Sequence, residues 1–324
     1  MPRPSLEKHQ VLIYLAAIIS GLVIGASEPP VGESLKFALF PVLGLLLYTT
    51  FTQVPMSHLR NAFTDSRFLA AAIMGNFVVV PGIIWGLLHI TPDDPAIRLG
   101  VLMVLFVPCT DWFITFTQLG GGDTRRAIAF APISLLVQIA LLPAFLWTFL
   151  GEDFTVTIAR GEMLLTFLGL IVAPLIAAFL TEKWAANDPH RIALKERMGW
   201  FPVPLLAVVV FIISASQVNV VLGSGSLLAR LLLVYGAFLI IAGLLARCMA
   251  WLFTLPTAQG RVLAFSFGTR NSFVVLPLVL ALPVSFEVAT VVVVFQSLVE
   301  LFGMAIYLWW VPKHLFPDTP RDTR

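Results

Sequence analysis

Charged residues are scarce in this 324-residue chain. Asp, Glu, Lys and Arg make up 12% of it, while hydrophobic residues make up 59% and the mean hydropathy is +0.94. Soluble domains carry about twice that fraction of charge. A soluble enzyme is excluded, because this composition could not cover the surface of a globule with polar groups. The net charge of +2 argues against binding to nucleic acid, which needs a concentrated basic face.

Residues with catalytic or metal-binding chemistry are also few. Two cysteines, Cys109 and Cys248, cannot make a disulfide framework, and the five histidines show no metal-ligand spacing. The sequence has no nucleophile–base pairing and no GxxxxGK[ST] phosphate-binding motif. We therefore expect neither an enzyme nor a resident cofactor.

What the sequence has instead is a series of long apolar runs. A membrane-spanning helix needs about 20 mainly apolar residues. Ten such runs lie between polar or Pro/Gly breaks, at residues 10–27, 35–54, 67–90, 97–118, 125–150, 161–181, 200–221, 227–253, 259–282 and 286–311. The sequence thus predicts an all-α integral membrane protein with ten transmembrane helices, surrounded by membrane lipid.

The positions of Lys and Arg predict the orientation, because cytoplasmic loops carry an excess of them. If both termini are cytoplasmic, fifteen of the 20 basic residues fall in inner regions and one, Arg270, lies inside a span. The outer loops then hold only Lys36, Arg98, Arg160 and Arg230. We expect a multi-pass protein of the cytoplasmic membrane with both termini inside the cell.

Ten spans can arise from two copies of five, and an odd number of spans inverts the second copy. A shift of 160 residues places 107–113, in the fourth run, on 267–273, in the ninth. We predict a first five-helix repeat over 1–150 and a second, inverted repeat over 151–324, which together form one integrated membrane domain.

Both matched runs contain a helix-breaking residue near the middle. Pro108 removes a backbone donor, and Gly268 permits the non-helical backbone that a break requires. Transporters with inverted repeats bind substrate near the midplane, at interrupted helices in corresponding positions. We expect helices four and nine to cross at their breaks there; the alternative is two ordinary kinks, since Pro and Gly are frequent in membrane helices.

Three charged side chains fall well inside spans: Asp111, Arg270 and Glu300. Each needs a partner or an aqueous cavity, because a lone ion at the bilayer centre costs about 2.5–3.5 kcal/mol on insertion scales. Asp111 and Arg270 follow the two breaks and could neutralise each other, either as a structural pair or as part of the mechanism. Glu300 could make a hydrogen bond inside the bundle or hold a proton.

Neutral polar groups lie at the same level as these charges. Cys109 is directly on the first break, next to Thr110, and Asn271 follows the second break. Gln138 and Gln296 lie deep in the fifth and tenth runs, where they could line a cavity or join two helices.

These features together resemble the bile acid/sodium symporter superfamily over essentially the whole chain. Within it, Pro108-Cys109-Thr110 is similar to the motif of the arsenite-efflux (arsenical resistance) branch in helix four, and Asn271 and Phe273 match the pattern of its helix nine. The resemblance implies that Cys109 contacts the transported metalloid. Thr110, Asp111, Arg270 and Asn271 lie next to the two breaks and are the other candidates for the substrate site, although Asp111 and Arg270 are not expected in the typical pattern of that branch.

The sequence departs from both branches of that superfamily. Val274 stands where the arsenite branch usually has a glutamate, so a proton-coupling role is expected to fall to Asp111 or Glu300 instead. In the sodium-coupled organic-anion branch, an acid and a glutamine usually occupy the positions of Ser266 and Arg270. A guanidinium there should repel sodium, although it could attract an anionic substrate.

The resulting hypothesis is a secondary transporter that exports arsenite, and antimonite with it, by exchange with protons. Trivalent arsenic prefers sulfur over oxygen ligands, and a single thiol binds weakly enough for a carrier to release its cargo. The alternative is a sodium- or proton-coupled transporter of small organic anions.

Overall fold

The computed structural model describes residues 3–54, 65–110, 112–158, 162–186, 188–218 and 225–318. Over these ranges the chain is helical and has no β-strand, apart from one isolated bridge between two residues. The helices are α1 (Arg3–Ser27), α2 (Pro29–Phe51), α4 (Ser66–Met74), α5 (Val80–Leu87), α6 (Pro95–Phe106), α7 (Trp112–Leu119), α8 (Thr124–Ile158), α9 (Glu162–Phe167), α10 (Ala173–Ala185), α11 (Pro189–Met198), α12 (Pro202–Ser216), α14 (Gly225–Leu252), α15 (Thr257–Gly268), α16 (Ser272–Leu280) and α17 (Val288–Trp310).

Short π-helical turns join or extend some of these helices. They are η2 (Gly75–Val79) between α4 and α5, η3 (Leu168–Val172) between α9 and α10, and η5 (Val311–Leu315) after α17; a 3₁₀ turn, η4 (Val284–Phe286), precedes α17. Each run that the sequence predicts as a span therefore coincides with one or more helices.

The structure confirms a helical membrane protein. Among the described residues, seven helical segments are long and apolar enough to cross a membrane, and Leu12–Ser27 and Pro95–Phe106 are shorter apolar helices. The fourth and ninth predicted runs each consist of two helices with non-helical residues between them. The ten-span inverted arrangement remains a prediction.

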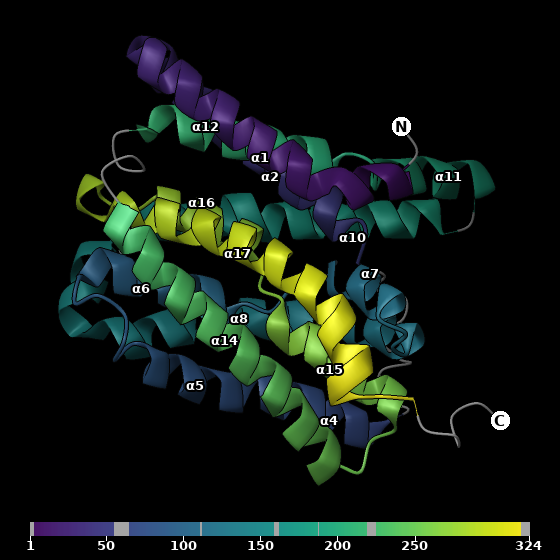
Figure 1. The fold of residues 1–324 in the computed structure, drawn as a ribbon. Coiled ribbons are helices and arrows are strands. Elements are labelled where there is room, and N and C mark those ends of the chain that lie inside the picture. Colours follow the sequence, from purple (N-terminus) through teal and green to yellow (C-terminus); the bar gives the residue numbers. More distant parts are fainter. Residues whose placement is uncertain are drawn as a thin grey trace.

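The helices form two bundles, which lie one above the other in Figure 1. In the first bundle α12 packs against α1 and α2, and α10 packs against α2. In the second bundle α14 packs against α15 and α17, α17 packs against α6 and α16, and α7 packs against α8. The two bundles meet where α16 contacts α2 and α9, and where α1 contacts α17.

Small residues bring α1 and α12 into direct backbone contact. Gly21 and Gly25 form a GxxxG pair on α1. A Cβ at Gly21 would overlap the carbonyl oxygen of Phe211, and one at Gly25 would overlap that of Ala215. Small residues at this spacing are a common way for membrane helices to approach closely, because lipid offers no hydrophobic driving force between them.

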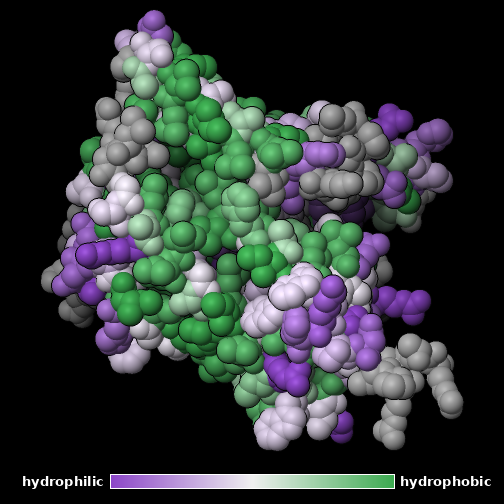
Figure 2. Space-filling view, viewed as in Figure 1, coloured by the Kyte–Doolittle hydropathy of each residue, from purple (hydrophilic) through white to green (hydrophobic). Residues whose placement is uncertain are grey.

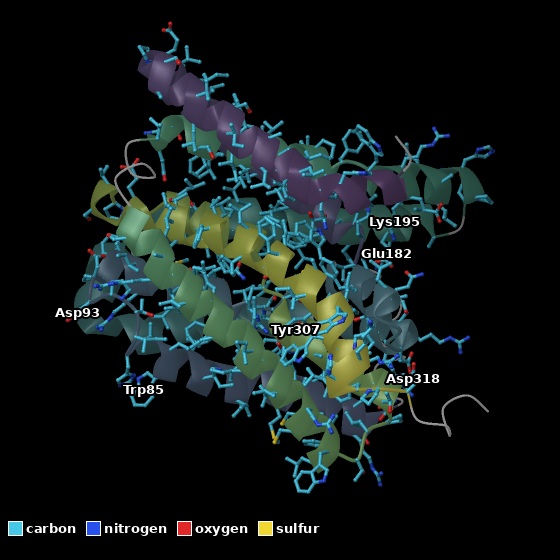
Figure 3. All side chains as sticks on the ribbon, in the orientation of Figure 1. Trp85, Asp93, Glu182, Lys195, Tyr307 and Asp318 are labelled. Carbon is cyan, nitrogen blue, oxygen red and sulfur yellow. The ribbon has the colours of Figure 1, made fainter. Side chains whose placement is uncertain are left out.

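The surface fits a lipid environment. Large apolar side chains are strongly exposed on several helices, among them Phe37 (87%), Leu233 (71%) and Trp251 (78%). Figure 2 shows hydrophobic residues covering the middle of the visible face, with hydrophilic residues towards its margins. Asp93 lies on one side of the molecule, and Lys195 and Asp318 lie on the opposite side (Figure 3).

We predict that Gly25→Val lowers the thermal stability of the purified protein, because the added methyl groups must push α1 away from α12. Overpacking of this kind costs about 1–3 kcal/mol. The measurement is the midpoint of thermal unfolding in detergent. Gly236→Val on α14 is the matched control, since nothing lies within 4 Å of a Cβ there; equal stability of both variants would contradict the close contact.

Candidate functional site

The two broken helices cross at their breaks and are joined by backbone hydrogen bonds. The amide of Cys109 donates to the carbonyl of Thr269 at 3.2 Å, and the amide of Asn271 donates to the carbonyl of Val107 at 2.7 Å. Pro108 and Arg270 lie opposite each other in this short antiparallel pair. The crossing that the sequence suggested is therefore present in the structure.

Local chemistry explains why each helix stops here. Pro108 has no amide to continue the ladder of α6, and Val107 already has an extended backbone. After the second break, the Asn271 side chain accepts from the amide of Val274 at 3.3 Å and caps the start of α16. Asn271 thus sets the first turn of a new helix directly after the crossing.

Gly268 is the last residue of α15 and not part of the non-helical segment, which comprises residues 269–271. A Cβ at this position would come within 2.8 Å of the ring of Tyr307 and 3.0 Å of the side chain of Met304. Tyr307, which lies near the centre of the molecule in Figure 3, is held by a hydrogen bond to the carbonyl of Leu239. The glycine therefore permits close packing against α17.

The guanidinium of Arg270 is buried and turns back onto the ends of two helices. Its Nη1 donates to the carbonyl of Leu105, in the last turn of α6, at 3.2 Å. Its Nη2 donates to the carbonyls of Ser266 (3.2 Å) and Phe267 (2.5 Å), in the last turn of α15. The last carbonyls of a helix have no partner within it, so one cation supplies donors to three carbonyls at two helix ends.

The carboxylate of Glu300 holds the backbone of the same residue. Its Oε2 accepts from the amide of Arg270 and from Nε2 of Gln296, both at 2.8 Å. Gln296 in turn accepts from the hydroxyl of Ser272, the first residue of α16, at 2.7 Å. The structure thus shows the bundle-facing hydrogen bond that the sequence suggested for Glu300, and it gives Gln296 a role in joining α17 to α16.

Several predicted site residues are brought together at the crossing. Cys109 is 3% exposed, and Thr110 and Asn271 are buried beside it. Among the described residues, Oγ1 of Thr110 and Nδ2 of Asn271 have no hydrogen-bond partner. Buried polar atoms of this kind are available to a ligand or to water. Asp111 lies outside the described residues, so the suggested ion pair between Asp111 and Arg270 is untested.

Asn76 is a contact that the sequence analysis missed. It lies in η2, where its Oδ1 accepts from Nη2 of Arg270 at 3.1 Å and its Nδ2 donates to the hydroxyl of Ser266 at 2.9 Å. The available signal was an amide in the middle of an apolar run, where a polar group needs a partner. Gln138 is similarly buried, and neither atom of its amide has a partner in the described part of the chain.

Aromatic rings lie at the boundary between the bundles, next to the crossing. Trp112, the first residue of α7, stacks on Tyr14 of α1 with ring centroids 6.2 Å apart. It also meets Phe273 of α16 edge-on at 5.3 Å. A small apolar cavity here is lined by Tyr14, Trp112, Leu206, Val210, Val294, Ser297, Leu298 and Leu301. Side chains of both bundles therefore meet beside the first helix break.

Comparison with known proteins adds two findings. Residues 40–224, more than half of the chain, match the family model described as "Sodium Bile acid symporter family". The chain is also similar to the arsenical-resistance protein Acr3 of Corynebacterium glutamicum, with 27% identity over 143 residues, or 43% of this chain. The match spans 37% of the length of that relative. Both findings agree with the resemblance drawn from the two breaks.

We predict that Glu300→Ala strongly lowers the yield and thermal stability of folded protein. It leaves the buried amide of Arg270 and Nε2 of Gln296 without the carboxylate that accepts from them, and each buried donor left without a partner costs about 1–3 kcal/mol. Glu287→Ala is the control, because its ion pair with Lys36 is partly exposed and such pairs contribute about 0–1 kcal/mol. The thermal unfolding midpoints of the two variants are compared in detergent. If both midpoints fall by the same small amount, Glu300 does not anchor the backbone of Arg270.

Proposed function

We propose that this chain, a multi-pass membrane transporter that belongs to the Sodium Bile acid symporter family, exports arsenite, and antimonite with it, across the cytoplasmic membrane. The observation that carries the proposal is the buried thiol of Cys109 on the first helix break, next to Oγ1 of Thr110 and near Nδ2 of Asn271, which have no hydrogen-bond partner among the described residues. The similarity to a protein named for arsenical resistance supports the same substrate.

The proposed topology has ten spans, with an inverted repeat of residues 1–150 in residues 151–324 and both termini in the cytoplasm. The start of α1 and the end of the described chain lie on the same side of the molecule (Figure 1), as an even number of spans requires. The paired breaks are the corresponding interruptions that an inverted repeat would place at the midplane.

The proposed substrate site consists of Cys109, Thr110, Asp111, Arg270 and Asn271. At neutral pH arsenite is mainly the uncharged acid As(OH)₃. The sulfur of Cys109 would bond to arsenic as one hydroxide leaves with the thiol proton as water, and the reverse step would release the cargo. The free hydrogen-bonding atoms of Thr110 and Asn271 suit the remaining hydroxyl groups. Rocking of the two bundles about the crossing would then alternate access.

An organic anion, the alternative suggested by the sequence, would need a cation to hold it. The two terminal nitrogens of Arg270 already donate to Leu105, Ser266, Phe267 and Asn76. Of the three guanidinium nitrogens, only Nε has no partner among the described residues, and this single N–H can donate to a neutral hydroxyl but cannot hold a carboxylate with two parallel hydrogen bonds. An uncharged substrate needs no such cation. We therefore favour arsenite over an anion.

We predict that Cys109→Ser abolishes arsenite efflux, because the substitution removes the soft ligand and nearly keeps the size of the side chain. Cys248→Ser should transport normally, since Cys248 is exposed on the outside of α14. The measurement is arsenite flux in proteoliposomes at matched protein density. Near-normal flux by both variants would reject the metalloid substrate and favour an organic anion.

Proton coupling is proposed to use Asp111, with Glu300 as the other candidate. We predict that Asp111→Asn loses the stimulation of arsenite flux by an imposed pH gradient but retains arsenite exchange between equal concentrations, because exchange needs no net proton movement. Asp93→Asn, in which the changed carboxylate is 89% exposed, is the control. If the pH gradient still drives flux in Asp111→Asn and no longer does so in Glu300→Gln, the coupling site is Glu300.

A further inference from the structure

The group that Arg270 binds has the composition of a site for a monovalent cation. Four neutral oxygens converge on its two terminal nitrogens at 2.5–3.2 Å: the carbonyls of Leu105, Ser266 and Phe267 and the amide oxygen of Asn76. They come from the ends of α6 and α15 and from η2, which are far apart in the sequence. In transporters with broken helices, unwound carbonyls and the C-terminal ends of half-helices hold the coupling cation.

The electrostatics of this place also suit a positive charge. The C-terminal end of a helix carries a partial negative charge of roughly half an electron, and two such ends meet here. The ring of Phe238 lies 5.2 Å from the centre of the guanidinium, at a distance typical of cation–π contacts. Arg270 is 3% exposed, so its charge faces these groups and not water.

We propose that the guanidinium of Arg270 is a tethered cation that permanently fills a cation site at the helix crossing. It joins the C-terminal ends of α6 and α15 as a bound ion would, but it cannot be released into either compartment. The site therefore cannot carry sodium across the membrane. The expectation that flux is independent of sodium rests on the proposed transport function. The proposal that Arg270 occupies the cation site does not rest on it.

If the Arg270 side chain is removed, the protein should need a free monovalent cation for its full thermal stability. In Arg270→Ala the same four oxygens remain, but no positive charge holds them together. We expect its unfolding midpoint in detergent to fall below that of the wild type in choline chloride. The midpoint should rise by roughly 2–5 °C in sodium chloride or millimolar methylguanidinium at equal ionic strength.

Three comparisons make the test specific. The wild type and Arg270→Lys, which keeps the charge, should unfold at the same temperature in all of these salts. Gly25→Val, which is destabilised elsewhere, should not respond to the choice of cation. Arg270→Gln keeps an amide donor but no charge; it should respond as Arg270→Ala does, and it replaces that variant if the alanine protein is not recovered from membranes.

The proposal is overturned if neither Arg270→Ala nor Arg270→Gln is stabilised by sodium or methylguanidinium relative to choline. It is also overturned if Gly25→Val shows the same stabilisation, because the effect would then be general. No arsenite is present in this experiment. Failure of the tethered cation thus leaves the arsenite proposal intact, and normal arsenite flux in Cys109→Ser would leave the tethered cation intact.

Discussion

Every backbone amide and carbonyl inside a membrane must find a partner within the protein, and this requirement governs the centre of the structure. A helix that stops in lipid exposes polar groups at a cost of several kcal/mol each. Here two helices stop, and their exposed groups satisfy one another through the pair between Val107–Cys109 and Thr269–Asn271. The carbonyls of Leu105, Ser266 and Phe267 accept from the guanidinium of Arg270, and the amide of Arg270 donates to Glu300. Removal of any one partner leaves a buried polar group without its hydrogen bond.

The same requirement explains why the polar residues are concentrated at one level of an apolar molecule. Asn76, Gln296 and Ser272 lie in three further elements, and each bonds to a member of this network. The elements that meet at the crossing are thereby fixed relative to one another. Oγ1 of Thr110 and Nδ2 of Asn271 have no partner within the described chain. These two atoms are polar groups at the crossing that the network leaves unused, and the proposed substrate site is built on them.

Sequence reasoning identified the parts whose signal is local. Pro108 lacks the amide that would continue its helix, and the apolar runs have the length of a membrane span, so the helices and the first break could be predicted from short stretches of sequence. The partners of Arg270 could not be predicted in this way, because Leu105 and Phe267 contribute backbone carbonyl oxygens, which every residue type has. Asn76 was missed because it lies about 190 residues from Arg270 along the chain and reaches it only through the fold. Gly268 was assigned to the break from its backbone freedom, whereas its missing side chain accommodates Tyr307.

The contact between α1 and α12 has a mechanical consequence. At Gly21 and Gly25 the backbone of α1 lies against the backbone of α12, so at these two positions α1 has no side chain whose rotamer could change and let the helices slide. The first bundle is stiff along this seam. Around Tyr14 and Trp112 the two bundles meet instead through rings and branched side chains, whose torsions can change without a shift of the backbone. Elastic strain applied to the molecule would therefore be released at the boundary between the bundles, a few residues from Cys109, and not within the α1–α12 pair.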